Sequence, residues 1–224
     1  MKALTTQPNL VEQVRDAILE EIASGAFAPG DRIIQEQIAQ ALGVSRQPVQ
    51  QALALLRNQG VLQDAPGRGL LVAPLDPGHV QHMYDIRAVI EGLAARRAAE
   101  LGAERAAKAG PALIEAGRKA VAAGSVAKMI AADMKFHEFI YSLSGNPLVA
   151  PALETHLAYT QRVMGEVLIS DEKPRDIWDQ HELILKAVMK GDGDRAEALM
   201  RSHLMQAAGF MVARLRGGNL EPAN

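Results

Sequence analysis

The sequence predicts a mainly α-helical protein: an N-terminal winged helix-turn-helix of three helices and a two-stranded wing, followed by an antiparallel bundle of six helices. Three observations lead to this fold class. Apolar residues recur at helical spacing along most of the chain. One strand-turn-strand pattern interrupts them at residues 61–72. A linker, Pro74-Leu75-Asp76-Pro77-Gly78, predicts a first domain at residues 1–75 and an all-helical second domain at 76–224.

The composition limits the class of protein. A chain of 224 residues is long enough for two modest domains, and its 48% hydrophobic residues include no run of eighteen, so no membrane span is expected. The chain contains no cysteine, which excludes disulfides and thiolate metal sites and suits a reducing cytoplasm. The first residues show no secretory signal pattern. The net charge of −2 does not indicate a broad basic surface.

Residues 9–24 and 34–60 predict the three helices of the first domain. The first helix carries an apolar stripe of Leu10, Val14, Ala17, Ile18 and Ile22. Two shorter helices follow, separated by Leu42-Gly43-Val44, and the second begins after Ser45, whose hydroxyl is a suitable N-cap. The outer face of the helix that begins after Ser45 carries side chains long enough to reach bases and phosphates. They are Arg46, Gln47, Gln50, Gln51 and Arg57. An ordinary helical hairpin is the alternative.

The segment after Gly60 favours a DNA-binding unit over a simple hairpin. Residues 61–63 and 70–72 predict two short strands joined by a turn. Arg68 stands at the tip of this turn, between Gly67 and Gly69, which allow the backbone to approach a phosphate or a minor groove. Such a hairpin beyond a recognition helix is a wing.

The second domain is predicted to be entirely helical. The six helices are expected near residues 77–101, 103–123, 126–144, 147–169, 174–190 and 193–216. Gly110-Pro111 is expected to kink the second of these or to delay its start.

Four polar residues interrupt the apolar stripes of three of these helices. Asp133 and His137 lie four residues apart on one inward face, and His181 and His203 lie on the inward faces of the last two helices. A divalent cation that collects all four would offset the cost of burying them, and oxygen and imidazole ligands suit zinc first, with nickel, manganese or iron as alternatives. The competing interpretation is that each is a hydrogen-bonded core residue. His79, His82 and His156 fall at stripe edges and are expected at the surface or its boundary.

The first domain resembles the GntR family of bacterial transcription regulators. The resemblance rests on F-x-P-G-D-R at residues 27–32, E-x-I-A-x-x-L-G-V-S-R-x-P-V at 36–49 and P-G-R-G-x-x-V at 66–72. It implies a homodimer on a short palindromic DNA operator, in the bacterial cytoplasm and on the nucleoid when bound. The predicted DNA-contacting residues are Arg32, Ser45, Arg46, Gln47, Gln50, Arg57, Gly67 and Arg68. Gln50 stands where the family usually has an arginine, so the preferred base shifts towards adenine.

The second domain is similar to the FCD domain of one GntR subfamily, and six helices would place it in the VanR-like branch. The metal set of that family, D-x-x-x-H then H-x-x-I then H-L, falls on Asp133, His137, His181 and His203. The resemblance implies that the metal keeps open positions for a small organic acid. Arg87 and Asn146 are the predicted effector-binding residues, and for Arg87 an ordinary salt bridge to Glu91 is the alternative.

The predicted function is therefore a metal-dependent, small-carboxylate-responsive DNA-binding transcription regulator, and not an enzyme. Two other functions remain open on the residues alone. One is a helical metalloenzyme with a fused DNA-tethering module, although the sequence has no H-E-x-x-H motif and no second carboxylate-rich metal set. The other is a DNA-binding protein with a purely structural metal.

Overall fold

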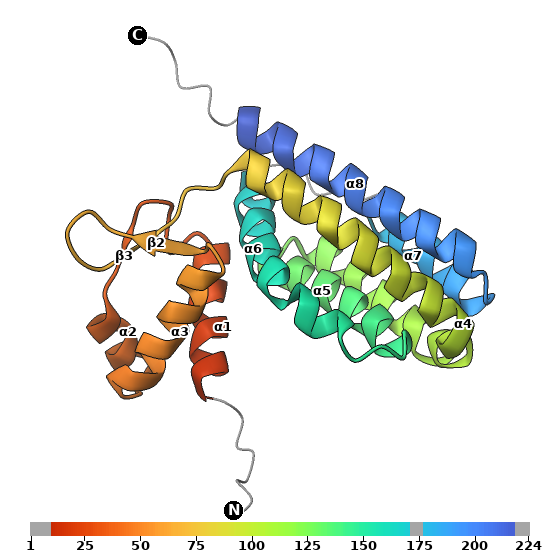
Figure 1. The fold of residues 1–224 in the computed structure, drawn as a ribbon, viewed down its shortest axis with the longest axis horizontal. Helices are drawn as coiled ribbons and strands as arrows, with labels where there is room; N and C mark the ends of the chain where they lie inside the picture. The colour runs from red at the N-terminus through yellow and green to blue at the C-terminus, as the bar shows by residue number, and fades with distance from the viewer. Residues whose placement is uncertain (1–9, 171–176, 218–224) are drawn as a thin grey trace, which may run out of the picture. The chain divides into compact units, whose positions relative to one another are not determined.

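The computed structural model describes residues 10–170 and 177–217 (Figure 1). They form two compact units, and the boundary between the units along the chain falls between Leu75 and Asp76. The first unit is a winged helix-turn-helix and the second is a helical bundle, so the predicted fold class is confirmed. No helix in these two ranges has both the length and the apolar content needed to cross a membrane.

The first unit has three helices around one core. They are α1 (Leu10–Ala23), α2 (Gln35–Leu42) and α3 (Arg46–Asn58). The predicted stripes supply the core, because Val14 and Ile18 of α1 and Val49 and Leu56 of α3 are buried. Gly43 ends α2 with a positive φ of 65°, a conformation that costs glycine little. The tight turn that this allows places α3 directly after α2.

The wing belongs to a three-stranded antiparallel sheet. Its strands are β1 (Arg32–Ile33), β2 (Leu62–Asp64) and β3 (Leu70–Val72), in the order β1-β3-β2. The two predicted strands are confirmed, but β1 was missed. Two residues are too few for an alternating pattern, and pairing with Leu70 and Leu71 of β3 is what makes this segment a strand.

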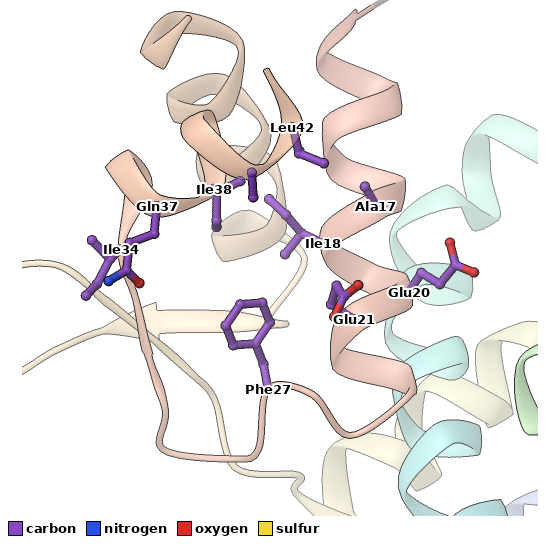
Figure 2. A pocket seen from close by; sticks show the side chains of 10 residues that line it. Ala17, Ile18, Glu20, Glu21, Phe27, Ile34, Gln37, Ile38 and Leu42 are labelled. Carbon is purple, nitrogen blue, oxygen red and sulfur yellow. The ribbon is translucent and has the colours of Figure 1, made fainter. Parts of the chain in front are cut away.

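An apolar groove of about 360 Å³ lies between α1 and α2 of this unit. Figure 2 shows Ile18, Ile38 and Phe27 along it, with Glu20 and Glu21 on the α1 side. The two carboxylates give the α1 side of this groove a negative charge, which disfavours a phosphate there.

The second unit consists of five helices within the described ranges, not the six expected. They are α4 (Pro77–Ala123), α5 (Val126–Leu143), α6 (Val149–Ser170), α7 (Ile177–Met189) and α8 (Gly193–Gly217). The predicted start of α7 at residue 174 lies outside the described residues. The two helices predicted at 77–101 and 103–123 are one helix of 47 residues. The assignment to the VanR-like branch loses its basis, since it rested on six helices.

Two residues explain why α4 does not break. A Cβ on Gly102 would lie 2.8 Å from the Leu143 Cβ, so this glycine serves the close packing of α5 and does not end a helix. Pro111 lies on the exposed face of α4, where water can serve the carbonyl that its missing N–H leaves unpaired. The predicted break near residue 102 and the predicted delayed start at Gly110-Pro111 are therefore wrong, whereas the kink at Gly110-Pro111 stays a prediction.

Helices α4 and α8 run side by side along the bundle, and α5 and α7 also pack on α4 (Figure 1). Gly117 of α4 leaves the space that the Trp178 ring of α7 fills, because an added Cβ would lie 2.0 Å from that ring. Trp178 in turn lies 4.8 Å from the His181 ring. This close packing brings the inward faces of α5, α7 and α8 together beside α4.

Candidate functional site

The N-terminal half of α3 presents an exposed polar surface. Ser45, Arg46, Gln47 and Gln50 are all exposed, whereas Val49 between them is buried. The first turn of α3 contains no acidic residue, so its free N–H groups and positive dipole end remain suited to a phosphate. Ser45 takes the N-cap position with extended backbone angles, but its side chain makes no capping hydrogen bond. Its hydroxyl group is therefore available to an external partner.

Arg46 is held at the start of α3 by residues of α2. Its guanidinium pairs with the Glu36 carboxylate, and its carbonyl oxygen accepts a hydrogen bond of 2.8 Å from the Gln35 amide. Arg46 and Glu36 are 65% and 71% exposed. An exposed ion pair contributes only ~0–1 kcal/mol, so a phosphate or a guanine can replace Glu36 at small cost.

The wing loop is organised by Arg32. Its Nη1 donates to the Arg68 carbonyl at 2.7 Å, and its Nη2 donates to the Pro66 carbonyl at 3.4 Å. Gly67 and Gly69 have φ values of 90° and 95°, which other residues rarely adopt. Arg32 was predicted to contact DNA, but in this structure it shapes the loop from which the Arg68 side chain extends into solvent.

Arg57, another predicted DNA contact, lies at the opposite end of α3 from Arg46. Eleven residues of helix separate the two by ~16 Å. The Arg57 Nη1 lies 3.3 Å from the Asp64 carboxylate of β2, an exposed ion pair that, like that of Arg46, contributes only ~0–1 kcal/mol. The structure therefore groups Ser45, Arg46, Gln47 and Gln50 on one surface, and gives Arg32 and Arg57 partners within the unit.

The four predicted metal ligands meet inside the second unit. Asp133 and His137 come from α5, His181 from α7 and His203 from α8, and all are buried. One nitrogen from each histidine lies within 4.8 Å of the others, and the Nε2 atoms of His181 and His203 are 3.2 Å apart. Asp133 joins them, with carboxylate oxygens 3.5 Å from the His181 Nε2 and 4.0 Å from the His137 Nε2. His79 and His82 are exposed and His156 is half-buried, as predicted.

Burial keeps His181 and His203 neutral, which is the form of the imidazole that binds a metal. Burial, with a smaller contribution from His137, lowers the pKa of His203 to about 3. Burial and the neighbouring His203 lower the pKa of His181 well below its ordinary value. Burial raises the pKa of Asp133 and outweighs the opposing influence of His137 and Arg87, so the charged carboxylate is disfavoured without a bound cation. Neutral imidazoles beside this buried carboxyl group form a donor set that fits a divalent cation, which would in turn favour the carboxylate.

Two residues behind the histidines were not predicted to act there. Glu91 of α4 accepts a hydrogen bond of 2.6 Å from His137 Nδ1, and Gln180 of α7 accepts one of 2.9 Å from His203 Nδ1. The available signal for Glu91 was an acidic residue on the inward stripe of α4. It was interpreted only as the possible partner of Arg87.

Arg87 pairs with this same Glu91. Its Nε donates to Glu91 Oε1 at 2.6 Å and its Nη1 donates to Thr160 Oγ1 at 2.9 Å, and its guanidinium lies 4.8 Å from the Tyr84 ring. Burial opposes ionisation of both partners, but their attraction prevails: it raises the pKa of Arg87 and, helped by His137, lowers the pKa of Glu91. Glu91 is therefore a carboxylate and Arg87 a cation.

A small cavity of about 20 Å³ adjoins the cluster. Asp133, His137 and His203 line it together with Arg87 and Tyr84. The other predicted effector residue, Asn146, does not line this cavity. Its Oδ1 accepts from the Leu148 N–H at 3.0 Å, in the turn before α6, and it borders a separate groove.

Comparison with known proteins matches both units to families. Residues 10–72 match the model of the gntR family of bacterial regulatory proteins, and residues 82–206 match the FCD domain. The HTH-type transcriptional repressor RspR of Escherichia coli K12 is 28% identical over 201 residues, covering 90% of this chain and 88% of that protein. A probable D-xylose utilization operon transcriptional repressor of Paenarthrobacter nicotinovorans is also 28% identical, covering 89% and 87%. Among solved structures, McbR/YncC of Escherichia coli has a TM-score of 0.79 at 22% identity, covering 93% of this chain and 98% of that one.

The low pKa values of His181 and His203 predict how stability depends on pH. The unfolded chain takes up protons below its ordinary histidine pKa of ~6.5, whereas the folded metal-free protein does not. The free energy of unfolding is therefore expected to fall between pH 6.5 and pH 5, by up to ~2–3 kcal/mol per pH unit for two such groups. Urea titration in the presence of a chelator measures this.

The control for that experiment is His181→Leu/His203→Leu, which removes both titrating groups. This variant should show a flatter pH dependence over the same range. Asp133 acts in the opposite direction. Because folding raises its pKa, its contribution to stability is full below its ordinary pKa of ~4 and is lost as the pH rises above that value. A slope of equal size in the variant and the parent would contradict the assignment to the two histidines.

Proposed function

Because this chain belongs to the GntR family of bacterial regulatory proteins and carries an FCD domain, it is a DNA-binding transcription regulator, and we propose that it senses a small carboxylate through a bound metal. The observation that supports this proposal best is the buried cluster of three histidines and Asp133 beside the cavity. RspR is named as a transcriptional repressor and the Paenarthrobacter nicotinovorans relative as a probable one, and the matched families are regulators, not enzymes.

The DNA-reading surface in this proposal is the exposed N-terminal half of α3 together with the wing. Ser45, Arg46 and Gln47 are positioned for a phosphate backbone and base edges, and Gln50 for an adenine. Arg68 and Gly67 would approach the adjacent groove. Arg32 serves mainly to shape the wing loop through its bonds to two carbonyl groups, whereas the exposed pair of Arg57 with Asp64 leaves Arg57 able to contact a phosphate.

Zinc is the metal we propose for the cluster, with nickel, manganese or iron as alternatives. Asp133, His137, His181 and His203 would hold it, since three imidazole nitrogens and one carboxylate suit all of these ions. When bound, such an ion supplies a Lewis-acidic position that accepts an anionic ligand.

The charges around the cluster favour a small acid as the effector. Arg87 and Glu91 neutralise each other, so a divalent ion with Asp133 leaves a net positive charge in a buried place. A carboxylate would neutralise it, and the Arg87 guanidinium also borders the cavity. The cavity of about 20 Å³ holds roughly one water molecule. A larger ligand must displace side chains, and Met164 and Met211 in its lining are flexible enough to move.

We also propose that the protein acts as a homodimer through the outer face of α4. Ile86, Val89 and Leu93 form a stripe there and are 46%, 55% and 46% exposed, and Leu148 beside it is 70% exposed. The last three border a groove of about 390 Å³. A two-fold axis would bury the stripe against its own copy and present two recognition helices to a palindromic operator. Effector binding would then shift the equilibrium between two states of the dimer that differ in operator affinity. The free energy of this shift cannot exceed the difference in the free energy with which the effector binds the two states.

Two other functions account for the site less well. A metalloenzyme would need a general base near the open metal position, but the carboxylate of Glu91 is already engaged by Arg87 and His137. A purely structural metal would not require a cavity next to its ligands.

Arg46→Ala is expected to weaken specific operator binding, because it removes the cation at the start of the recognition helix. The expected loss is ~1–3 kcal/mol, or about 5- to 150-fold in affinity, and it should be specific to the operator. Fluorescence anisotropy with operator and scrambled DNA measures it. Arg97→Ala is the matched control, because Arg97 is an exposed arginine on α4, and this variant should bind the operator as the parent does. Equal affinity of the Arg46 variant and the parent would remove α3 from this proposal.

His203→Ala and Asp133→Ala are expected to lose zinc and with it the response to acids. Isothermal titration with zinc should give a heat of binding for the parent and none for either variant. A thermal-shift screen of small organic acids on the zinc-loaded parent should then find acids that raise the melting temperature and are recovered unchanged. His82→Ala is the control, because His82 is exposed and outside the cluster. Turnover of the acid would favour the enzyme, and zinc binding without any acid response would favour a structural metal.

Leu93→Glu is expected to convert the dimer to a monomer, because it would bury a carboxylate at the centre of the proposed interface. Sedimentation velocity at micromolar concentration measures the change, and operator affinity should fall with it. Leu183→Glu is the matched control, since Leu183 is 47% exposed on α7 and not part of the stripe. A dimer that persists in the Leu93 variant would place the interface elsewhere.

A further inference from the structure

The three histidines of the cluster have different partners behind them. The Nδ1 atom of His137 contacts a carboxylate and that of His203 contacts an amide oxygen. The Nδ1 atom of His181 is buried without a hydrogen-bond partner among the described residues. A neutral imidazole carries its proton on one nitrogen only, so these partners determine which nitrogen is left to bind a metal.

Of the two Nδ1 contacts, that of His137 is the more rigid. Glu91 is fully buried, and each of its oxygens has its own partner: Oε1 accepts from Arg87 and Oε2 accepts from His137. Arg87 is itself anchored to α6 through Thr160. Because both oxygens are engaged, the carboxylate cannot turn without breaking a short hydrogen bond to a charged group or an imidazole.

The His203 contact is less enclosed. Gln180 is half-buried, and its amide nitrogen donates to Gln206 Oε1 at 3.2 Å. That bond orients the amide so that its oxygen faces His203. His181 is placed instead by packing, with the Phe136 ring stacked 4.3 Å away and the Trp178 ring at 4.8 Å. The three imidazoles are therefore oriented by a carboxylate, an amide and aromatic packing, respectively.

We propose that Glu91 is the principal positioning residue of the metal site. It holds the His137 proton on Nδ1 and directs the Nε2 lone pair to the cluster, while Arg87 keeps Glu91 in place. Gln180 does the same for His203 with a weaker acceptor. The inference rests on the proposed metal site, and it makes the Arg87–Glu91 pair a part of that site as well as an ion pair of the fold.

Two double variants separate this role from simple charge pairing. Arg87→Met/Glu91→Gln removes both buried charges but leaves an acceptor for His137, whereas Arg87→Met/Glu91→Leu removes the acceptor too. Partners of this kind change metal affinity by ~10- to 100-fold. We expect the Leu variant to bind zinc at least ~10-fold more weakly than the Gln variant in a competition titration with a chelating dye. Arg97→Met/Glu100→Gln, an exposed pair on the same helix, is the control and should match the parent. Equal zinc affinity of the two double variants would overturn the proposal.

Gln180 provides a test that does not alter the buried ion pair. Gln180→Glu places a carboxylate behind His203 and should tighten zinc binding several-fold, whereas Gln180→Leu should weaken it. A merely structural role predicts no gain from the Glu substitution. Zinc affinity that is the same in both variants would contradict the role assigned to this position, even if the double variants at Glu91 fail to fold.

The metal-free protein gives an independent readout. Two-bond proton–nitrogen correlation spectra of the nitrogen-15-labelled chain distinguish the histidine tautomers, and His137 is identified by the signal lost in His137→Asn. We expect the Nδ1–H form in the parent and a mixture of both forms in Arg87→Met/Glu91→Leu. An Nε2–H form in the parent would refute the inference. If this tautomer result holds but zinc does not bind, the positioning stands and the proposed metal function fails.

Discussion

The cost of keeping a carboxylate and three imidazoles inside an apolar helical bundle is the constraint on which the second unit depends. Asp133, His137, His181 and His203 are all less than a tenth exposed. Polar groups in such a place destabilise the fold unless they are hydrogen-bonded or bound to a cation. Glu91 and Gln180 satisfy two of the imidazoles, which leaves Asp133 and the Nε2 atoms facing one another. The outward-facing Nδ1 atoms of His137 and His203 are therefore hydrogen-bonded, whereas Asp133 and the Nε2 atoms are the groups that a bound cation would contact.

Much of this arrangement could be predicted from the sequence, because burial on a helix has a period. The four inward positions follow from the apolar stripes of α5, α7 and α8, and so do the exposed positions of His79 and His82. The residues of the α3 surface were likewise predicted, since Val49 and Leu56 alternate with exposed residues at helical spacing. Those patterns depend on one helix at a time.

The features that were missed depend on contacts between elements. The sequence predicts a helix boundary between residues 101 and 103, but the missing side chain of Gly102 serves contact with Leu143 of α5, which no local pattern reveals. The partnership of Glu91 with His137 joins residues 46 positions apart. The partners of Arg32 and Arg57 within the first unit, which are carbonyl and carboxylate oxygens that the folding of the wing brings to them, could not be predicted either, and their contact with DNA stays a prediction. Periodicity shows which side of a helix is buried, and it does not identify the neighbour on that side.

The unbroken length of α4 has a consequence that reaches both of its faces. Arg87 and Glu91 belong to its inner side, while Ile86, Val89 and Leu93 belong to its outer side within the same two turns. A continuous helix transmits a twist or a tilt from one side to the other, because its backbone hydrogen bonds do not allow the two to move separately. If self-association takes place on the outer side, ligand occupancy and the monomer–dimer equilibrium become thermodynamically linked variables. The apparent affinity for a ligand would then depend on how concentrated the protein itself is.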